Sequence, residues 1–500
     1  MSEGLGLGGV YGATIERIKA QDGDKSRLGI EALMWISHAE LPLRVDELCH
    51  ALAVELGSTD FNADNVPSMS TLVGCCQGLI TVDQEASTVR LVHFTLKEYI
   101  SAHPDIFSRP HSVIAEICLT YLNSQQVNAI STNPSPGTAI LVHDKPFLTY
   151  CSLYWGVHAK KELSDHARSL ALGLLLEYDG HISAEFLLEP VGYLDLDVCG
   201  AGFQFNGLHC ASFFGIVELV VDLIEVGCYD INGQDFGGYT SLAWAAYNGH
   251  EEVVELLLEQ EEVSCDMPDD FGRTPLWYAA QEGHEGVVQI LLGQKGVNPD
   301  EPASDGQTPL SSAAQGGHEA VVKILLGRDE VNPNSEDDYC FTPLALAALR
   351  GYDGVVKMLL ERDDINPEKS DDGGRTPLIL AAKEGHEGVV KILLEREVSP
   401  DGQDYDGRTA LVFAAEKGHE GVVKILLGRD EVSPDRPDIY SRTPLLSAAG
   451  EGHAGVVKML LEQNDVDPNT SSPYYGTPLS SAAEKEHEVV VKMLLERGRH

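Results

Sequence analysis

A pattern of about 34 residues recurs through the C-terminal part of this chain, and this repetition limits the possible folds more than any other feature. In its clearest copy, Thr376-Pro377-Leu378 is followed by Ala381-Ala382, by Gly385-His386 and by a mostly apolar run over residues 389–394. The threonine recurs at intervals of 34 residues, with one interval of 33, at Thr240, Thr274, Thr308, Thr342, Thr376, Thr409, Thr443 and Thr477. A degenerate copy at residues 208–211 precedes these eight, so the sequence predicts about nine units.

Each part of the pattern has a local structural role. Thr376 is suited to cap a helix N-terminus, and Pro377 fits the first helical position because its missing N–H would be unpaired there anyway. The small Ala381 and Ala382 let a neighbouring helix approach closely, and Gly385 permits the positive φ that ends the helix. The sequence therefore predicts two helices and a loop per unit. A single helix pair cannot bury its apolar face alone, so the units are expected to stack into a solenoid.

This pattern resembles the ankyrin repeat, and the resemblance covers residues 206–500. It implies a non-catalytic protein that binds other proteins through its loop tips and concave face. One departure is that the histidine which usually follows Thr-Pro-Leu in that family is replaced in all eight plain copies, although His209 keeps it in the degenerate first unit. The last unit ends without a clear polar cap.

Residues 15–100 predict a winged-helix domain of three helices, at residues 28–37, 45–55 and 70–77, followed by a hairpin of residues 79–82 and 88–94. The segments at residues 32–36, 42–48, 78–82 and 91–100 resemble the winged helix that follows the NACHT module in large fungal ankyrin-containing proteins. A similar segment is named after GPI inositol-deacylase.

Two further segments complete the expected organisation. We expect residues 1–14 to form a flexible N-terminus, because they are rich in glycine. Residues 101–205 are expected to form an irregular helical connector that caps the first repeat. The predicted fold class is mostly α, an ankyrin solenoid preceded by a winged helix and this connector.

The charge of the chain argues against two classes of partner. The net charge is −43, which repels phosphate backbones and anionic membrane surfaces. The expected recognition helix at residues 70–77 also carries no Lys or Arg. We therefore expect no nucleic acid and no membrane as partner, and a protein partner of basic character is the easiest to accommodate. The charge is equally well explained as a source of solubility for a monomeric solenoid.

No catalytic, cofactor or metal site is expected. No phosphate-binding loop of the Walker type precedes the winged helix, and no G-x-S-x-G motif occurs. The histidines of the Gly-His turns would lie about 10 Å apart in stacked units, too far to share a metal ion. We expect each to hydrogen-bond to backbone instead. Ten irregularly spaced cysteines and the absence of a signal-like first segment predict a cytoplasmic or nuclear protein.

The loops between repeats carry the candidate binding residues. Just before the motif threonine, aromatic side chains occur in six of eight copies and arginines in four. Tyr and Arg contribute strongly to binding at protein interfaces. The predicted partner-binding residues are Phe236, Phe271, Arg273, Tyr339, Arg375, Tyr405, Arg408, Tyr440, Arg442 and Tyr474. The alternative for this row is partly buried packing within the turn. The alternative for the whole chain is the regulatory or sensor portion of a NACHT-type NTPase whose nucleotide-binding module is missing from it.

Overall fold

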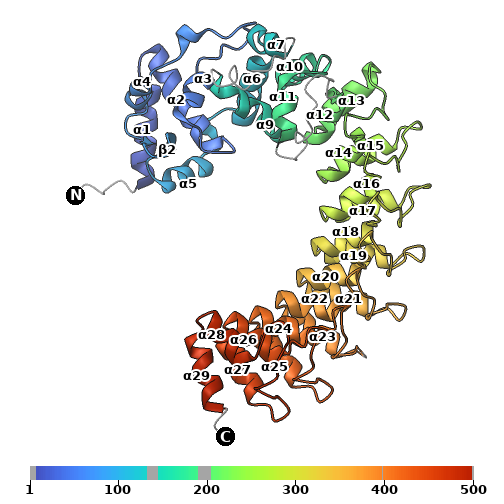
Figure 1. Cartoon of the computed structure of the whole chain (residues 1–500). Coiled ribbons are helices and arrows are strands. Elements are labelled where there is room, and N and C mark those ends of the chain that lie inside the picture. The colour runs from blue at the N-terminus through green and yellow to red at the C-terminus, as the bar shows by residue number, and fades with distance from the viewer. Residues whose placement is uncertain (1–6, 132–144, 190–203, 397, 498–500) are drawn as a thin grey trace. The chain divides into compact units, whose positions relative to one another are not determined.

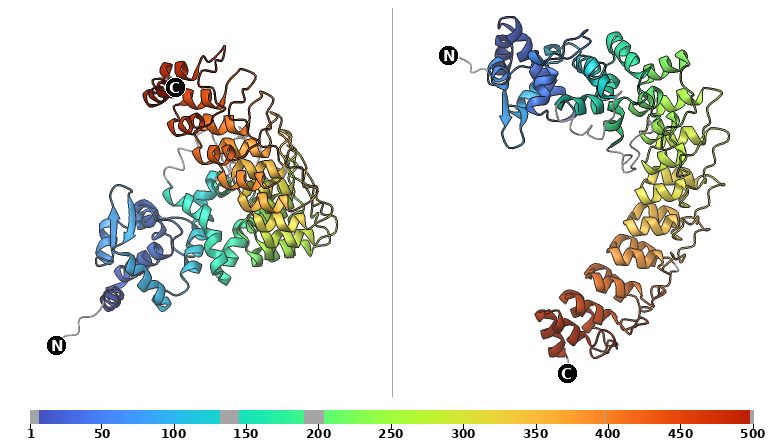
Figure 2. Two further views of the ribbon diagram at one scale, coloured as in Figure 1. Left: turned by 90° about the horizontal axis from the view of Figure 1, so that it is seen from below. Right: turned by 45° about the horizontal axis from the view of Figure 1, so that its top comes forward.

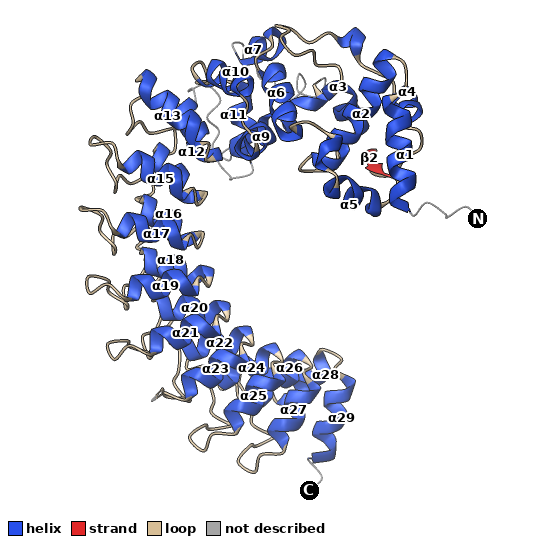
Figure 3. Cartoon of the chain, turned by 180° about the vertical axis from the view of Figure 1, so that it is seen from behind, coloured by secondary structure: helices blue, strands red, loops and turns tan. Residues whose placement is uncertain are grey.

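The computed structural model describes residues 7–131, 145–189, 204–396 and 398–497, and divides into two compact units, Met1–Ser264 and Cys265–His500. Most of its regular structure is helical, and the strands of the described chain are β1 and β2 in the first unit (Figures 1 and 3). Within the described residues, no helix has both the length and the apolar character needed to cross a membrane.

The N-terminal part of the first unit is a winged helix, as predicted. Its helices are α1 (Leu7–Lys19), α2 (Gly23–His38), α3 (Val45–Ala51), α4 (Met69–Cys75) and α5 (Phe94–Ala102). The wing consists of β1 (Ile80–Asp83) and β2 (Thr88–Leu91), which pair antiparallel with Ile80 opposite Leu91. Arg44 adds an isolated bridge to Thr88 at the edge of this hairpin.

The prediction of a flexible segment over residues 1–14 is wrong from Leu7 onward, where α1 begins; residues 1–6 lie outside the described part of the chain. Tyr11, Ile15 and Ile18 recur at helical spacing and are buried, so packing outweighs the low helix propensity of the glycines. A Cβ at Gly12 would lie 2.7 Å from the hydroxyl of Tyr99 on α5, which explains why glycine faces that helix.

The second strand of the wing is shorter than predicted. The sequence suggested that it continues to residue 94, but β2 ends at Leu91 and α5 begins at Phe94. His93 caps this helix, because its Nδ1 accepts a hydrogen bond from the backbone N–H of Thr95 at 3.3 Å. The apolar run at residues 91–96 is therefore shared between a strand and a helix.

The connector contains five described helices that pack against both of its neighbours within the first unit. They are α6 (Pro110–Leu122), α7 (Gln125–Ser131), α9 (Pro146–Lys161), α10 (Asp165–Leu175) and α11 (Ile182–Leu188). Trp35 of the winged helix packs edge-on against Phe147 of α9, with ring centroids 5.6 Å apart. The guanidinium of Arg168 on α10 donates two hydrogen bonds, of 2.6 and 2.5 Å, to the carboxylate of Asp222 in the first repeat. The helical connector thus covers the first repeat, as the sequence suggested.

The repeats are helix pairs in both units. The first unit contains α12 (Gly207–Phe214), α13 (Val217–Val226), α14 (Ser241–Tyr247) and α15 (Glu251–Leu258). The second contains α16 (Pro275–Gln281), α17 (Glu285–Leu292), α18 (Pro309–Gly316), α19 (Glu319–Leu326), α20 (Pro343–Arg350), α21 (Asp353–Leu360), α22 (Pro377–Glu384), α23 (Glu387–Leu394), α24 (Ala410–Lys417), α25 (Glu420–Leu427), α26 (Pro444–Glu451), α27 (Ala454–Leu461), α28 (Pro478–Glu484) and α29 (Glu488–Arg497). Figure 2 shows the pairs of the second unit stacked in sequence order, with their loops on one side.

The motif threonines cap the first helix of each pair, as predicted. In all eight copies the hydroxyl oxygen accepts a hydrogen bond from the backbone N–H three residues later, at 3.1–3.4 Å. In the degenerate first repeat Asn206 has this role, and His209 donates a hydrogen bond from Nε2 to the carbonyl of Gly233 at 2.9 Å. The cap therefore fixes where each helix begins.

The Gly-His turns join one repeat to the previous one. Gly385 ends α22 with a φ of 85°, and the ring of His419 in the next repeat lies directly over it. The Nε2–H of these histidines donates to a carbonyl near the end of the preceding repeat's first helix; the pairs are His250 with Phe213, His318 with Gln281, His386 with Leu349, His419 with Lys383, His453 with Glu416 and His487 with Gly450. The predicted hydrogen bond to backbone is confirmed at these positions, and it connects neighbouring repeats.

Candidate functional site

The predicted aromatic residues lie in the loops between repeats, and in the second unit their side chains are open to solvent. Exposure ranges from 38 % for Tyr440 to 74 % for Tyr405 and Tyr474, with Phe271 and Tyr339 between these values. Phe236, in the first unit, is half-buried. Two exposed side chains beside the row, Ile439 and Tyr475, were not among the predicted residues. We call Phe271, Tyr339, Tyr405, Tyr440 and Tyr474 the aromatic row.

Backbone hydrogen bonds between successive loop tips hold the aromatic row in register. In each bond an N–H of one loop donates to a carbonyl of the loop before it, at 2.7–3.1 Å. The pairs are Ser304 with Phe271, Asp338 with Asp305, Asp372 with Tyr339, Tyr405 with Gly373 and Ile439 with Asp406. The tips therefore form a continuous edge of the second unit, and each aromatic side chain projects from a fixed backbone.

The four predicted arginines are bound within their own turns. Arg375 donates from Nε to Oδ2 of Asp371 at 2.8 Å, and Asp371 also accepts from the backbone N–H groups of residues 373 and 375. Arg273, Arg408 and Arg442 pair in the same way with Asp269, Asp404 and Asp438. These arginine side chains are 19–28 % exposed. The arginines thus fit the alternative of turn packing, whereas the side chains of the aromatic row are exposed.

The aspartate five residues before the motif threonine is a structural residue that the sequence analysis missed. It occurs in six of the eight copies, which is a periodic signal that could have identified it. Where no arginine follows, other groups replace it, and Asp235 accepts a hydrogen bond from Nε1 of Trp244 at 2.8 Å. Burial raises the pKa of Asp337, whose repeat has Phe341 at the arginine position.

The edge that carries the aromatic row is acidic. Asp270, Asp305, Asp338 and Asp372 are exposed at the tips, between the aromatic side chains. The arginines of these turns pair at shorter distances with buried carboxylates, and Arg375 reaches the exposed Asp372 only at 3.9 Å. This edge therefore combines large aromatic side chains with negative charge.

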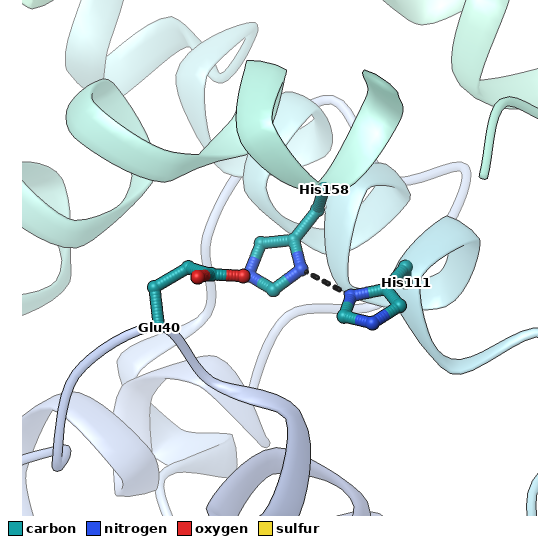
Figure 4. Close-up of side chains that lie close together, drawn as sticks. All are labelled: Glu40, His111 and His158. Carbon is teal, nitrogen blue, oxygen red and sulfur yellow. Dashed lines mark hydrogen bonds between the residues drawn. The ribbon is translucent and has the colours of Figure 1, made fainter. Parts of the chain in front are cut away.

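A second group of polar side chains lies in the first unit, between the winged helix and the connector. His111 of α6 and His158 of α9 place their Nδ1 atoms 2.8 Å apart, and Glu40 approaches from the loop after α2 (Figure 4). One ligand atom of each of the three residues lies within 4.8 Å of the others. These residues are far apart in the sequence and share no motif, so no spacing signal could have identified them. We call Glu40, His111 and His158 the histidine cluster.

The electrostatics of the histidine cluster keep its rings neutral. Burial, together with the smaller effects of the neighbouring His111 and Lys161, lowers the pKa of His158 to about 3. Burial also lowers the pKa of His111. The hydroxyl of Tyr150 lies 2.9 Å from Nε2 of His158, so both ring nitrogens of this buried residue have hydrogen-bond partners. Near neutral pH both imidazoles thus carry a lone pair.

Comparison with known proteins identifies both parts of the chain. The family described as "Ankyrin repeats (3 copies)" matches residues 208–303, 295–371, 364–438 and 432–500. The family described as "GPI inositol-deacylase, winged helix domain" matches residues 17–118. The human protein "Ankyrin repeat and SAM domain-containing protein 3" is 37 % identical over 68 residues, which are 12 % of this chain. The chain thus spans about 10 % of the length of this curated relative.

The ankyrin matches cover more than half of the chain and agree with the capped helix pairs, the Gly-His turns and the projecting loops. Ankyrin repeats indicate a role in protein–protein interaction. The chain belongs to the ankyrin-repeat family and carries a winged helix of the GPI inositol-deacylase type before its repeats.

Proposed function

We propose that this protein is a non-catalytic interaction scaffold whose aromatic row binds a protein partner with a basic and partly apolar surface. The observation that carries this proposal is the exposure of five aromatic side chains at five of the seven loop tips of one unit. Aromatic side chains bury large areas at interfaces and lose little conformational freedom.

The charge of the same edge supports the basic character of the partner. Exposed aspartates lie beside and between the aromatic side chains from Phe271 to Tyr405, and Lys or Arg groups of a partner would pair with them. Complementary charge mainly speeds association and excludes acidic competitors, while the aromatic contacts supply most of the affinity. Binding is therefore expected to weaken in high salt but not to vanish.

A triple substitution tests this function. The variant combines Tyr339→Ser, Tyr405→Ser and Tyr474→Ser, which remove the three most exposed rings of the row. Proximity labelling in cells should identify partner proteins with the wild-type chain, and we expect these partners to be lost with the triple variant. The melting temperature should stay within a few degrees, because exposed side chains contribute little to stability. Phe94→Ala is the control, since Phe94 is 69 % exposed but lies outside the repeats. Unchanged labelling by the triple variant would contradict the proposal.

The arginines provide a second control. Arg375→Ala leaves the buried carboxylate of Asp371 without its main partner, so we expect a loss of roughly 1–3 kcal/mol in stability. Labelling of the partner should decrease only in proportion to the fraction of the variant that is unfolded. This separates the supporting role of the arginines from the binding role of the aromatic row.

A second candidate function is that of a regulatory portion of a NACHT-type NTPase system. The observation that favours it is the winged helix matched over residues 17–118, which resembles the segment that follows NACHT modules. On this proposal the chain acts with a nucleotide-binding protein, and complexes purified through it should bind ATP that the isolated chain does not bind. Complexes without any nucleotide-binding component would reject it.

A further inference from the structure

We propose that the histidine cluster is a binding site for a divalent transition-metal ion, with Nδ1 of His111, Nδ1 of His158 and a carboxylate oxygen of Glu40 as its protein ligands. The sequence analysis expected no metal site. Imidazole and carboxylate are the nitrogen and oxygen ligands that Zn²⁺ accepts in sites with an open fourth position.

The two imidazole nitrogens lie close to the spacing that a metal ion requires. Zn–N distances of about 2.0–2.1 Å in tetrahedral geometry place two ligand nitrogens roughly 3.3–3.4 Å apart. The Nδ1 atoms of His111 and His158 are 2.8 Å apart, so the rings must separate by about 0.5 Å. His158 is fully buried, while His111 is half-buried and is the second residue of α6. The His111 ring is therefore the one able to move.

A metal ion can bind both Nδ1 atoms without net loss of a proton from the cluster. In the metal-free cluster one Nδ1 donates its hydrogen to the other, since both rings are neutral. When a metal occupies both lone pairs, the ring that donated carries its hydrogen on Nε2 instead. If that ring is His158, its Nε2–H faces the hydroxyl oxygen of Tyr150, which can accept it. Such an outer hydrogen bond commonly orients a metal-binding imidazole.

The surroundings of the cluster also hold its ligands in place. The hydroxyl oxygen of Tyr150 accepts a hydrogen bond from the backbone N–H of Glu40 at 3.2 Å, which fixes the start of that side chain. His38 packs edge-on against His111, with ring centroids 5.5 Å apart, and Nδ1 of His38 faces the carbonyl of Met34 instead of the cluster. Tyr150 of α9 thus positions the backbone of Glu40, and His38 of α2 contacts the ring of His111.

Lys161 is the natural competitor for the metal ion. Its ammonium group contacts a carboxylate oxygen of Glu40, and both side chains are partly exposed. Glu40 must turn toward the imidazoles to bind a metal, because ligand atoms up to 4.8 Å apart exceed the span of one ion. A metal ion and Lys161 would therefore exclude each other at Glu40, and removing the ammonium group should raise the metal affinity.

The test uses the full chain, stripped with a chelator and titrated with Zn²⁺ against a chromophoric competitor. We expect one Zn²⁺ per chain that Glu40→Gln weakens about 10-fold or more and that His111→Ala abolishes. Lys161→Met should tighten it several-fold. The control is His103→Ala, an exposed histidine in the same unit, and it should bind as the wild type does. Co²⁺ in place of Zn²⁺ should give the visible absorption of a tetrahedral site.

Equal Zn²⁺ affinity in the wild type, Glu40→Gln and Lys161→Met would overturn the proposal and leave a purely hydrogen-bonded cluster. If His111→Ala fails to fold, the Glu40→Gln and Lys161→Met variants still test the proposal. Both side chains are partly exposed, so these variants are expected to fold. A wild-type Co²⁺ spectrum typical of six oxygen ligands would also overturn it, since the ion would then be held by surface carboxylates.

Discussion

One position in the repeats is occupied by Asn in some copies and by Asp in others, and the two residues form different hydrogen bonds. Eight residues before the motif threonine, the amide of Asn334 donates to the carbonyl of Asp364 at 2.7 Å, and its oxygen accepts from the N–H of Asn366 at 2.8 Å. At the same position of another repeat, Oδ2 of Asp266 accepts from the N–H of Asn298. Its Oδ1 is buried and has no hydrogen-bond partner among the described residues. A carboxylate at this position therefore leaves unused a bond that an amide makes.

We predict that Asp266→Asn stabilises the protein by about 0.5–1.5 kcal/mol at pH 7, because the new amide can donate to backbone. Burial raises the pKa of Asp266 above its ordinary value. The ionised carboxylate of Asp266 therefore destabilises the folded state at neutral pH. This destabilisation decreases as the pH falls through the folded-state pKa, because folding favours the protonated form. The gain in stability should shrink toward pH 4. Denaturant unfolding at both pH values measures it.

The reverse substitution is the matched control. Asn334→Asp should destabilise the protein at pH 7 by a similar amount, because it removes the donor that bonds to Asp364. If both substitutions changed stability in the same direction, the difference between amide and carboxylate would not be the cause.

At the scale of the helix pair, the Gly-His turn makes neighbouring repeats depend on one another. The αL glycine ends one helix, and the absence of a Cβ there admits the histidine ring of the next repeat. The ring then bonds back to a carbonyl of the repeat it covers. In one interface Tyr352 takes the place of the histidine, and its ring lies over Gly317. Each junction between these pairs therefore combines a helix end, a ring contact and, with histidine, a hydrogen bond.

We predict that Gly385→Ala lowers stability by about 2–3 kcal/mol. An L side chain at positive φ costs about 1–2 kcal/mol, and losing the bond from His419 to Lys383 adds about 1 kcal/mol. The new Cβ would lie 2.7 Å from Nδ1 of His419, so the ring must move. Thermal and denaturant unfolding measure the loss.

Gly402→Ala serves as the comparison, because this loop glycine meets nothing nearer than a carbonyl oxygen at 3.4 Å. We expect a change within about 0.5 kcal/mol there. A similar loss at both glycines would show that chain flexibility, and not the turn to the next repeat, sets the cost.

At the scale of the whole molecule, charge imbalance dominates the electrostatics. The chain has 78 acidic and 35 basic side chains, so most acids would lack a basic partner even if every basic group were paired. Many of the ion pairs in the described residues are partly exposed, and such pairs contribute about 0–1 kcal/mol each. Repulsion among the remaining carboxylates therefore opposes the folded state.

We predict that raising NaCl from about 0.05 to 0.5 M increases the melting temperature, because the screening length falls well below 10 Å over this range. Screening weakens the repulsion more than it weakens the exposed ion pairs. An increase of a few degrees is expected, equivalent to about 1 kcal/mol in a chain of this size. A steady decrease would mean that ion pairs outweigh the repulsion.

Local features of the sequence were sufficient for the repeats. Thr376 and its equivalents mark where helices begin, the glycines mark where they end, and the constant interval shows that the pairs stack. The aromatic row was predictable for the same reason, since aromatic residues occur three or four residues before the motif threonine in six of the eight copies. Helix caps and turn glycines act within a few residues, so both interacting groups lie in the same short segment of the sequence.

Contacts between distant residues were decided only by the tertiary structure. Helix α1 forms because its apolar stripe is buried, although its glycines disfavour a helix. The sequence predicted the arginines as binding residues, but Asp371 and its equivalents pair with them inside the turn. Glu40, His111 and His158 come together from separate segments. The sequence by itself determined the repeating scaffold because its signals are local and periodic, whereas burial and pairing depend on which segments meet after folding.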